Sequence, residues 1–414
     1  MHDTTMRYLQ RNAGELNKQL EQISSTQKIN RPSDNPIGFT NALNYGNILS
    51  ALGQQKINME DGEIYMNILE TTHKSINNVF GRCNDLAVQS ANDTENHQNR
   101  LFTNMEIREL LQEMVSIAQT KHKDSYIFSG KWTNQPSYEI KNGEAAYETS
   151  QLSATIPIPF DDDKITIPLL DGNYFDPNLR STAENPDSNP AVQRIIPGTV
   201  SGLTGLLEKS HLNDPENEEA DYEIDYVEGT ITLLSHRAKA AFYDETTGNF
   251  RAAEGPDQRP LITFDYIYRN SIDMSGEIHR EVSTGITMQI NTDPDDLFGK
   301  DGRGQTDSFK EIISLMQGLW YNDQSQINNS IKNLETGSER NLTQQAVEGA
   351  RQSRLSTIYD RNDYFTTDNT DAKTTLQDID VAEAWTDFMM ADAVYNLSLQ
   401  SAAKIMQRSL MDYL

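Results

Sequence analysis

Both ends of the chain carry apolar residues at the alternating three- and four-residue spacing of a coiled-coil seam. The N-terminal stripe consists of Met6, Leu9, Ala13, Leu16, Leu20 and Ile23. The C-terminal stripe, interrupted by Asp392 and Asn396, consists of Ala382, Trp385, Met389, Leu399, Ala403, Met406, Leu410 and Tyr413. A helix with one exposed apolar stripe gains too little from its own backbone bonds to offset its ordering entropy. We therefore expect each stripe to pack against the other stripe, a neighbouring helix or another subunit.

The two polar positions of the C-terminal stripe allow two interpretations. A polar residue in a coiled-coil seam costs stability but can fix the register of the helices. Asp392 and Asn396 are therefore either register-setting residues or a small solvated gap. The neighbouring Trp385, Phe388 and Met389 are interpreted as packing residues rather than as a cofactor patch.

A polar segment follows the N-terminal stripe and predicts a corner in the chain. It contains Arg31, Pro32, Asp34 and Pro36, and neither proline can continue a helix interior. A second seam begins at Tyr45 and continues to residue 87, which predicts one helix of about fifty residues.

Another polar break at 91–96 precedes a helix carrying Ile107 and Met114, expected to fold back on the long helix as an antiparallel partner.

From about residue 133 to 305 the pattern becomes the alternation of β-strands, punctuated by Pro and Gly. Alternating apolar residues predict strands around 156–160, 165–169, 224–226, 231–233, 262–266 and 286–290. Val227–Thr230 is typical of a tight hairpin, Asp171–Asn173 of a turn, and Pro177–Pro190 of a long loop or a boundary between two β modules.

Helical spacing returns after residue 305, and a polar joint at Thr366–Asp371 is expected before the C-terminal stripe. The returning helices can bury their stripes only beside the first set. The predicted fold is α+β and multidomain: N- and C-terminal helices pair into a coiled-coil-like bundle, with a β-rich insertion between them. The predicted divisions are 1–40 (assembly helix and corner), 41–132 (rod), 133–305 (insertion, one module or two), 306–371 (rod) and 372–414 (assembly helix).

Composition limits the functions of such a chain. Acidic residues number 62 against 35 basic ones among 414, a net charge of −27 that disfavours binding to nucleic acid or anionic membranes. The apolar share of 36% is low, so much of the chain is expected to be solvated helix or loop. A single cysteine, Cys83, excludes an intramolecular disulfide. No secretory leader and no stretch of about 18 apolar residues is evident, so no membrane partner is expected.

No motif predicts chemistry. The acids at 161–163 and 293–296 lack the spacing of a calcium loop, and Gly130-Lys131 lacks the other residues of a phosphate loop. His73 lies within a seam, where a packed histidine is commoner than a ligand. We expect no catalytic residue, no cofactor and no metal, and hence no enzyme.

Several motifs together resemble the flagellin superfamily. They are Arg7–Ile23 with the corner Lys28–Gly38, the phrase Tyr126–Gly130, Glu348–Arg351, and the ending Gln400–Leu414. The tail Lys404–Leu414 and the phrase Phe128-Ser129-Gly130 are most similar to the members that join the flagellar hook to the filament. The resemblance covers both helical thirds and fades in the middle.

The resemblance implies a secreted structural subunit of the bacterial flagellum, exported unfolded through the type III channel and assembling with itself and neighbouring flagellar subunits. It also implies an export chaperone that binds the C-terminal helix. The expected assembly interface is Met6, Leu9, Leu16, Leu20, Ile23, Trp385, Met389, Leu399, Met406, Leu410 and Tyr413. The alternatives are a flagellin filament subunit, or an adhesive or carbohydrate-active exoprotein.

Overall fold

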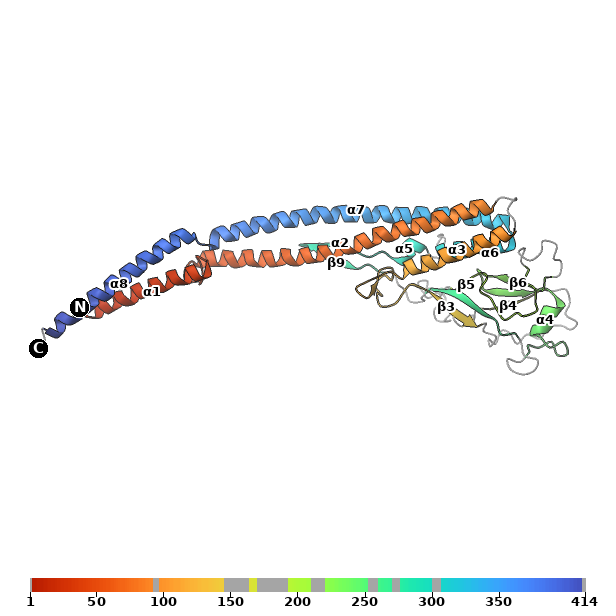
Figure 1. Ribbon diagram of the computed structural model, residues 1–414, viewed down its shortest axis with the longest axis horizontal. Coiled ribbons are helices and arrows are strands. Elements are labelled where there is room, and N and C mark those ends of the chain that lie inside the picture. The colour runs from red at the N-terminus through yellow and green to blue at the C-terminus, as the bar shows by residue number, and fades with distance from the viewer. Residues whose placement is uncertain are drawn as a thin grey trace. The chain divides into compact units, whose positions relative to one another are not determined.

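The structure is a computed structural model that describes residues 2–91, 97–144, 164–169, 193–209, 220–251, 260–269, 276–299 and 307–411. Helices come first, strands follow and helices return, which confirms the predicted α+β architecture with a β-rich insertion (Figure 1). The chain forms two compact units. The first comprises residues 1–61, 281–287 and 354–414, and the second comprises 62–280 and 288–353.

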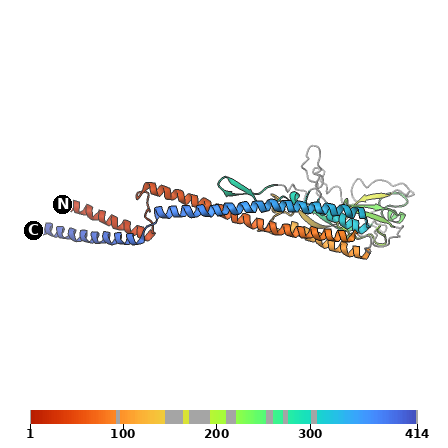
Figure 2. The same ribbon diagram turned by 90° about the horizontal axis from the view of Figure 1, so that it is seen from above.

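The first unit is built from helices of the two chain ends. Helix α1 (His2–Ser25) lies along α8 (Val381–Met411), and the start of α2 (Pro36–Ser90) lies along the end of α7 (Gln324–Gln377), as Figures 1 and 2 both show. The tip of a hairpin formed by β9 (His279–Ser283) and β10 (Ile286–Gln289) also belongs to this unit. The predicted pairing of the terminal helices is confirmed.

Helix α7 continues through the polar segment that we expected to form a joint. Thr366 and Thr370 donate their hydroxyls to the carbonyls of Asn362 and Thr366, at 2.8 and 2.6 Å, so these side chains are satisfied within the helix. The prediction of a break at Thr366–Asp371 is therefore wrong. The helix ends at Gln377, and Asp380 caps α8 by accepting from the backbone N–H of Ala382 at 2.9 Å.

The second unit contains the rest of the long helices and the β insertion. Helix α3 (His97–Ala118) folds back beside α2, where Arg82 and Glu106 form an exposed ion pair at 2.6 Å. Helix α6 (Ser308–Tyr321) precedes α7 and lies beside α3. The remaining helices are the short α4 (His236–Phe242) and α5 (Pro294–Phe298), which we did not predict.

The described strands form two three-stranded antiparallel sheets and two hairpins. One sheet has the order β3 (Tyr138–Glu144), β8 (Thr263–Arg269), β5 (Gln193–Ile195). The other has the order β4 (Ile165–Pro168), β7 (Thr230–Leu233), β6 (Tyr222–Asp225). One hairpin is β9–β10, and the other joins β1 (Lys121–His122) to β2 (Ser125–Tyr126).

The predicted hairpin between β6 and β7 is confirmed, with Gly229 at φ +68° supplying the left-handed turn residue. The predicted strand at 156–160, the turn at Asp171–Asn173, the loop at Pro177–Pro190 and the acids 161–163 lie outside the described residues.

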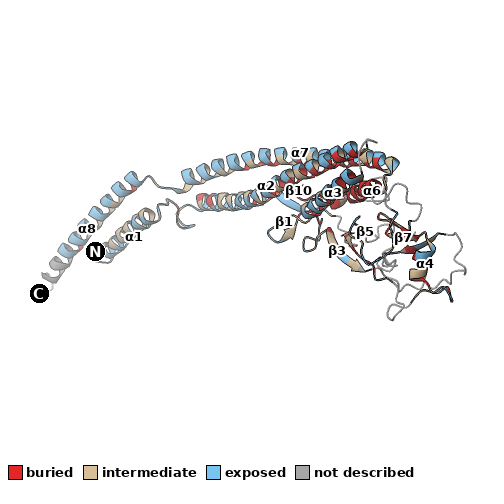
Figure 3. Cartoon of the chain, turned by 45° about the vertical axis from the view of Figure 1, so that its right-hand side comes forward, coloured by how far each residue is buried: buried red, intermediate tan, exposed pale blue. Residues whose placement is uncertain are grey.

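One hydrophobic core joins the helices and sheets of the second unit. The rings of Tyr138, Phe298 and Phe309 pack together, with centroids 4.2 Å apart for Tyr138 and Phe309. Figure 3 shows the buried residues of α2, α3 and α6 where these helices face each other. The acids near residue 293, which we expected in a loop, instead begin α5, because Asp293 accepts from the backbone N–H of Asp295 at 2.9 Å.

The first unit has far fewer buried apolar side chains. Those in its described part are Ile29, Ala42, Met59, Val282, Leu355, Ile358, Ala384 and Ala402. The first unit therefore has a much smaller hydrophobic core than an ordinary domain.

Candidate assembly surfaces

Helices α1 and α8 contact each other through a seam of small and partly buried side chains. On α8 the residues facing α1 are spaced by four and three: Ala384, Phe388, Ala391, Tyr395, Ser398 and Ala402. Ala384 and Ala402 are buried, and Ser398 accepts a hydrogen bond of 2.6 Å from the Asn12 amide of α1.

The stripe predicted on α8 does not face α1. Each of its positions from Trp385 to Ala403 follows a seam position by one residue, and one residue turns a helix by about 100°. Trp385, Met389 and Leu399 are 50%, 68% and 42% exposed. The sequence left three possible partners for this stripe: the stripe on α1, a neighbouring helix or another subunit. For the residues of the α8 stripe that the structure describes, α1 is therefore excluded.

The seam face of α8 is flanked by exposed apolar residues on both sides. The Trp385 stripe lies on one side of the seam. Met390, Val394 and Leu397, which are 56%, 50% and 62% exposed, lie on its other side. Sequence reasoning missed this second stripe, although its three- and four-residue spacing is visible in the sequence. The side chains of Met406 and Leu410, and residue Tyr413, lie outside the described part of the structure.

On α1 the residues of the predicted stripe differ in how far they are buried. Leu9, Leu16 and Ile23 are partly buried, while Met6 and Leu20 are 43% and 52% exposed. No side chain described on α1 is fully buried.

The interrupting residues of the α8 stripe contact each other. The Asn396 amide donates to the Asp392 carboxylate at 3.1 Å, and both side chains are exposed. This contact lies within one helix, so within one copy of the chain these two residues set no register against α1.

The corner between α1 and α2 is held by the residues that the sequence singled out. The Asp34 carboxylate accepts the backbone N–H groups of Asn30 and Arg31 at 3.3 and 3.0 Å. Pro32 occupies the second position of a turn closed by the Asp34 N–H and the Arg31 carbonyl at 3.0 Å. Arg31 also forms an exposed ion pair of 2.9 Å with Glu21 of α1.

Helix α2 begins immediately after this turn. The Asn35 side chain accepts the Gly38 N–H at 2.9 Å as the N-cap, and Pro36 is the first helical residue, where its missing N–H costs nothing.

This corner is bonded to the break between α7 and α8. The Lys28 N–H donates to the Gln377 carbonyl at 2.5 Å, and the Ile379 N–H donates to the Thr26 carbonyl at 3.2 Å. Thr26 has φ +57°, the left-handed conformation that a β-branched residue rarely adopts. The α1–α2 corner and the α7–α8 break therefore lie beside each other and are hydrogen-bonded together. No local sequence pattern indicates this contact.

In the second unit, α2 and α7 are joined by a buried polar cluster. His73 of α2 lies between Asn341 and Glu348 of α7, with ring nitrogens 2.5 Å from the Asn341 carbonyl oxygen and 2.8 Å from the Glu348 carboxylate. The expectation that His73 is a packed residue of the seam is confirmed, since it is fully buried.

A second polar cluster joins the β insertion to α6. The Glu208 carboxylate accepts from the hydroxyls of Tyr226 and Tyr321 and from the indole of Trp320, at 2.7, 3.0 and 3.1 Å. Burial raises the pKa of Glu208 even though these three donors act in the opposite direction. The cluster fixes the insertion on the helices and contains no nucleophile beside a base.

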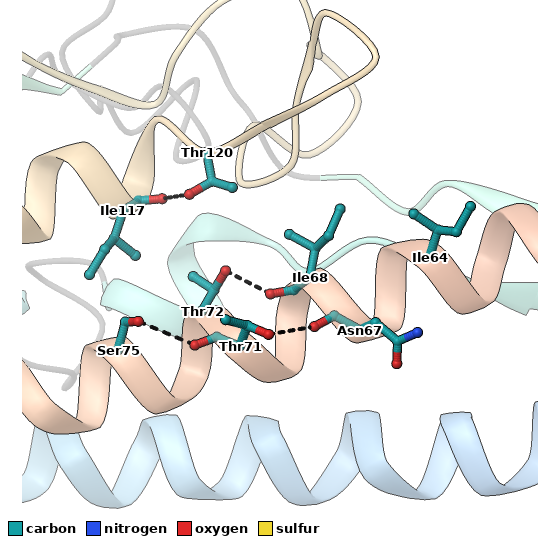
Figure 4. A pocket seen from close by; sticks show the side chains of 8 residues that line it. All are labelled: Ile64, Asn67, Ile68, Thr71, Thr72, Ser75, Ile117 and Thr120. Atoms are coloured by element: carbon teal, nitrogen blue, oxygen red, sulfur yellow. Dashed lines mark hydrogen bonds between the residues drawn. The ribbon is translucent and has the colours of Figure 1, made fainter.

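An open groove of about 540 Å³ lies between α2 and the end of α3. Figure 4 shows its lining residues: Ile64, Asn67, Ile68, Thr71, Thr72, Ser75, Ile117 and Thr120. The hydroxyls of Thr71, Thr72 and Ser75 donate to carbonyls one turn earlier in α2, at 3.0, 2.8 and 3.3 Å. The groove therefore presents mainly methyl groups and suits an apolar surface better than a polar substrate.

Within the described residues, no group of three or more His, Cys, Asp or Glu side chains is arranged to hold a metal ion. None of the helices in that part of the chain has a stretch long and apolar enough to cross a bilayer.

The helices at the two chain ends pair with each other, and a β-rich insertion lies between them in the sequence. The sequence profile of the bacterial flagellin N-terminal helical region matches residues 1–133. The flagellar filament 41 kDa core protein of Borreliella burgdorferi is 31% identical over 248 residues, which cover 54% of this chain and 72% of that protein. The chain belongs to the flagellin family.

Other relatives match over shorter stretches. The flagellar filament 33 kDa core protein of Treponema phagedenis is 27% identical over 121 residues, which cover 28% of this chain and 42% of that protein. The chain thus spans less than half the length of this curated relative. Among solved structures, a putative flagellar hook-associated protein from Vibrio parahaemolyticus is similar, with a TM-score of 0.48 and 13% identity over 83% of this chain and 100% of that chain.

Proposed function

We propose that this chain is a structural subunit of the bacterial flagellum and acts at the junction between hook and filament, as hook-associated protein 3 does. The observation that carries the proposal is the exposed stripe of α8. Trp385, Met389 and Leu399 stay in contact with water although α8 is already paired with α1. Burying a fully exposed side chain of this kind contributes roughly 1.5–3 kcal/mol, and assembly would supply the part of it that corresponds to the surface still exposed here.

A second copy of the chain, or another flagellar subunit, is the partner that this surface requires. The thin core of the first unit supports the same conclusion, because additional helices would complete it. The role is structural rather than catalytic, in keeping with membership of the flagellin family.

The junction is favoured over the filament by the motifs of the sequence, namely Phe128-Ser129-Gly130 and the ending Lys404–Leu414. A filament subunit is the second candidate, because the curated relatives are filament proteins. Copy number and position separate the two roles. A junction subunit is scarce and confined to the tip of the hook, whereas a filament subunit dominates shed flagella.

Immunogold labelling of isolated flagella with antibody against this chain tests the assignment. Gold at a single band where the hook meets the filament is the expected result. Gold along the filament would instead assign the chain as a flagellin, and its absence from flagella would contradict both flagellar roles.

Export and chaperone binding form part of the proposal. The chain would cross the flagellar type III channel unfolded, and a cytoplasmic chaperone would cover the apolar residues of α8 until export. Deleting residues 385–414 is expected to abolish both chaperone capture and filament attachment. The second unit should still fold, because its core contains none of the deleted residues.

A further inference from the structure

The polar cluster around His73 determines the charge of the histidine. The two ring nitrogens of His73 face two oxygens, the side-chain carbonyl of Asn341 and the carboxylate of Glu348. The Asn341 amide nitrogen donates to the backbone carbonyl of His73 at 2.9 Å, which fixes its oxygen toward the ring. Both ring nitrogens must therefore donate, and only the imidazolium has two N–H groups.

Neither neutral tautomer satisfies this arrangement. One ring nitrogen would then direct a lone pair at an oxygen, either that of Asn341 or that of Glu348. Turning the Asn341 amide over would repair the first contact but would direct its oxygen at the His73 carbonyl. Loss of the proton therefore costs at least one buried hydrogen bond in every case.

The cluster joins three segments of the second unit. Glu348 accepts from His73 of α2 with one carboxylate oxygen and from the Thr292 hydroxyl with the other. Thr292 follows β10 and precedes α5. The charge state of His73 thus affects both the pairing of α2 with α7 and the attachment of the segment after the β9–β10 hairpin.

Glu348 is the charged group that acts on His73. On α2, the nearest charges along the helix are Glu70 and Lys74, which pair with each other at 2.7 Å in an exposed position. Beyond Thr292, Asp293 is the next titratable group, and burial raises its pKa to about 6. Burial lowers the pKa of His73, but the hydrogen bond and charge of Glu348, with the hydrogen bond of Asn341, raise it above its ordinary value.

Water has a route to the cluster. A small pocket of about 170 Å³ between α2 and α7 is lined by Met66, Glu70, Gln345, Glu348, Gly349 and Gln352. This volume holds several water molecules, at about 30 Å³ each. Glu348 is one of the residues that line this pocket, so water can approach the pair from this side.

We propose that His73 is a proton-dependent clamp: as an imidazolium it locks α2, α7 and the segment after β10 together through Glu348, and its loss of the proton at alkaline pH loosens all three. The folded state binds this proton more tightly than the unfolded chain does. The stabilisation is therefore complete below the ordinary pKa of histidine, about 6.5, and is lost as pH rises through the higher pKa of the folded state. This inference does not depend on the proposed flagellar role.

Nitrogen-15 NMR of the full-length protein tests the charge state directly. At pH 7 both ring nitrogens of His73 should show the shifts of protonated nitrogen. His279, which is exposed and 2.8 Å from Glu277, provides a comparison within the same protein. A His73 ring with one unprotonated nitrogen at pH 7 would overturn the proposal without any mutation.

Hydrogen exchange measures the coupling to the rod. Peptides covering 66–80 and 341–352 should lose protection between pH 6 and pH 9, after correction for intrinsic exchange rates. The loss should equal the factor by which folding strengthens proton binding at His73, which the NMR titration gives independently.

Two variants and a control complete the test. His73→Leu and Glu348→Gln should each remove the pH dependence of protection, whatever they do to its level at pH 6. His279→Gln should leave that dependence unchanged. If His73→Leu retained the wild-type loss of protection between pH 6 and pH 9, another group would be responsible and the clamp would be rejected.

Discussion

At the scale of single residues, the corner between α1 and α2 depends on one position without a side chain. A Cβ atom at Gly38 would lie 2.6 Å from the Ile29 Cδ1 atom and 2.7 Å from the Asn35 amide nitrogen. Ile29 is buried, and Asn35 is the N-cap of α2. Gly38 is thus required by close packing rather than by an unusual backbone conformation.

Replacing Gly38 by alanine should therefore destabilise the corner. Displacing the Asn35 cap and Ile29 is expected to cost about 1–2 kcal/mol, more than the roughly 0.5–1 kcal/mol that alanine contributes to a helix. Hydrogen exchange of the amides in residues 27–40 measures the change in opening free energy.

Gly46→Ala is the matched control, because nothing lies within 4 Å of a Cβ atom there and the site is also in α2. It should stabilise the helix by about 0.5–1 kcal/mol. Equal effects from the two variants would show that Gly38 has no packing role.

The sequence predicted this corner correctly, because proline and aspartate act locally. Pro32, Asp34 and Pro36 use bonds within a few residues of themselves, and local bonds leave local patterns. The contact between Gly38 and Ile29, and the bonds from Lys28 and Thr26 to the α7–α8 break, connect residues that no short pattern relates.

At the scale of helices, sequence reasoning identified α8 correctly, but the stripe that it identified is not the face of α8 that contacts α1. Large apolar residues dominate any pattern of hydrophobicity, so Trp385 and Met389 defined the predicted stripe. The contact with α1 instead uses Ala384, Ala391 and Ala402, which a pattern of large apolar residues does not mark, together with Phe388 and Tyr395. The prediction of a joint at Thr366–Asp371 failed because polar side chains do not always end a helix. Threonine and asparagine here donate hydrogen bonds to backbone carbonyls one turn earlier in the same helix.

The seam between α1 and α8 gives a direct test at this scale. Ala402→Leu should separate α1 from α8, because three extra carbon atoms must fit into a buried contact, at a cost of about 1–3 kcal/mol. Proteolysis or hydrogen exchange of the free chain, read in peptides of α8 up to residue 404, should show faster opening.

Ala403→Leu adds the same atoms one residue further along, where the side chain is exposed. It should leave the opening rate of α8 unchanged or reduced. Faster opening in Ala403→Leu than in Ala402→Leu would mean that α8 contacts α1 through the Trp385 stripe rather than through the seam that contains Ala402.

At the scale of the whole molecule, the two units differ in how much apolar surface they bury. The second has a core shared by helices and sheets, whereas the first consists of helix pairs with few buried apolar side chains. Composition indicated this division, since a chain of low apolar content cannot fill a core throughout. The topology of the two sheets was beyond prediction because strand partners such as β3 and β8 are more than a hundred residues apart.

Because the α8 stripe is exposed in one copy and would be buried in the assembly, folding and assembly can be separated by mutation. The double variant Trp385→Asp, Met389→Asp should keep the helicity and thermal stability of the free chain, since both side chains already contact water. It should abolish filament attachment, because two carboxylates would be buried without partners at a cost of several kcal/mol each. Electron microscopy of the cells should show bare hooks, and the culture supernatant should contain the exported variant.

Thr386→Asp, Gln400→Asp is the matched control, with the same added charge at exposed positions on the side of α8 that faces away from α1. Cells carrying it should bear normal filaments if assembly uses the Trp385 stripe. Normal filaments on cells with the Trp385→Asp, Met389→Asp variant would show that this stripe is not buried in the flagellum. Loss of filaments in both variants, with export intact, would instead place the contact on the outer side of the helix.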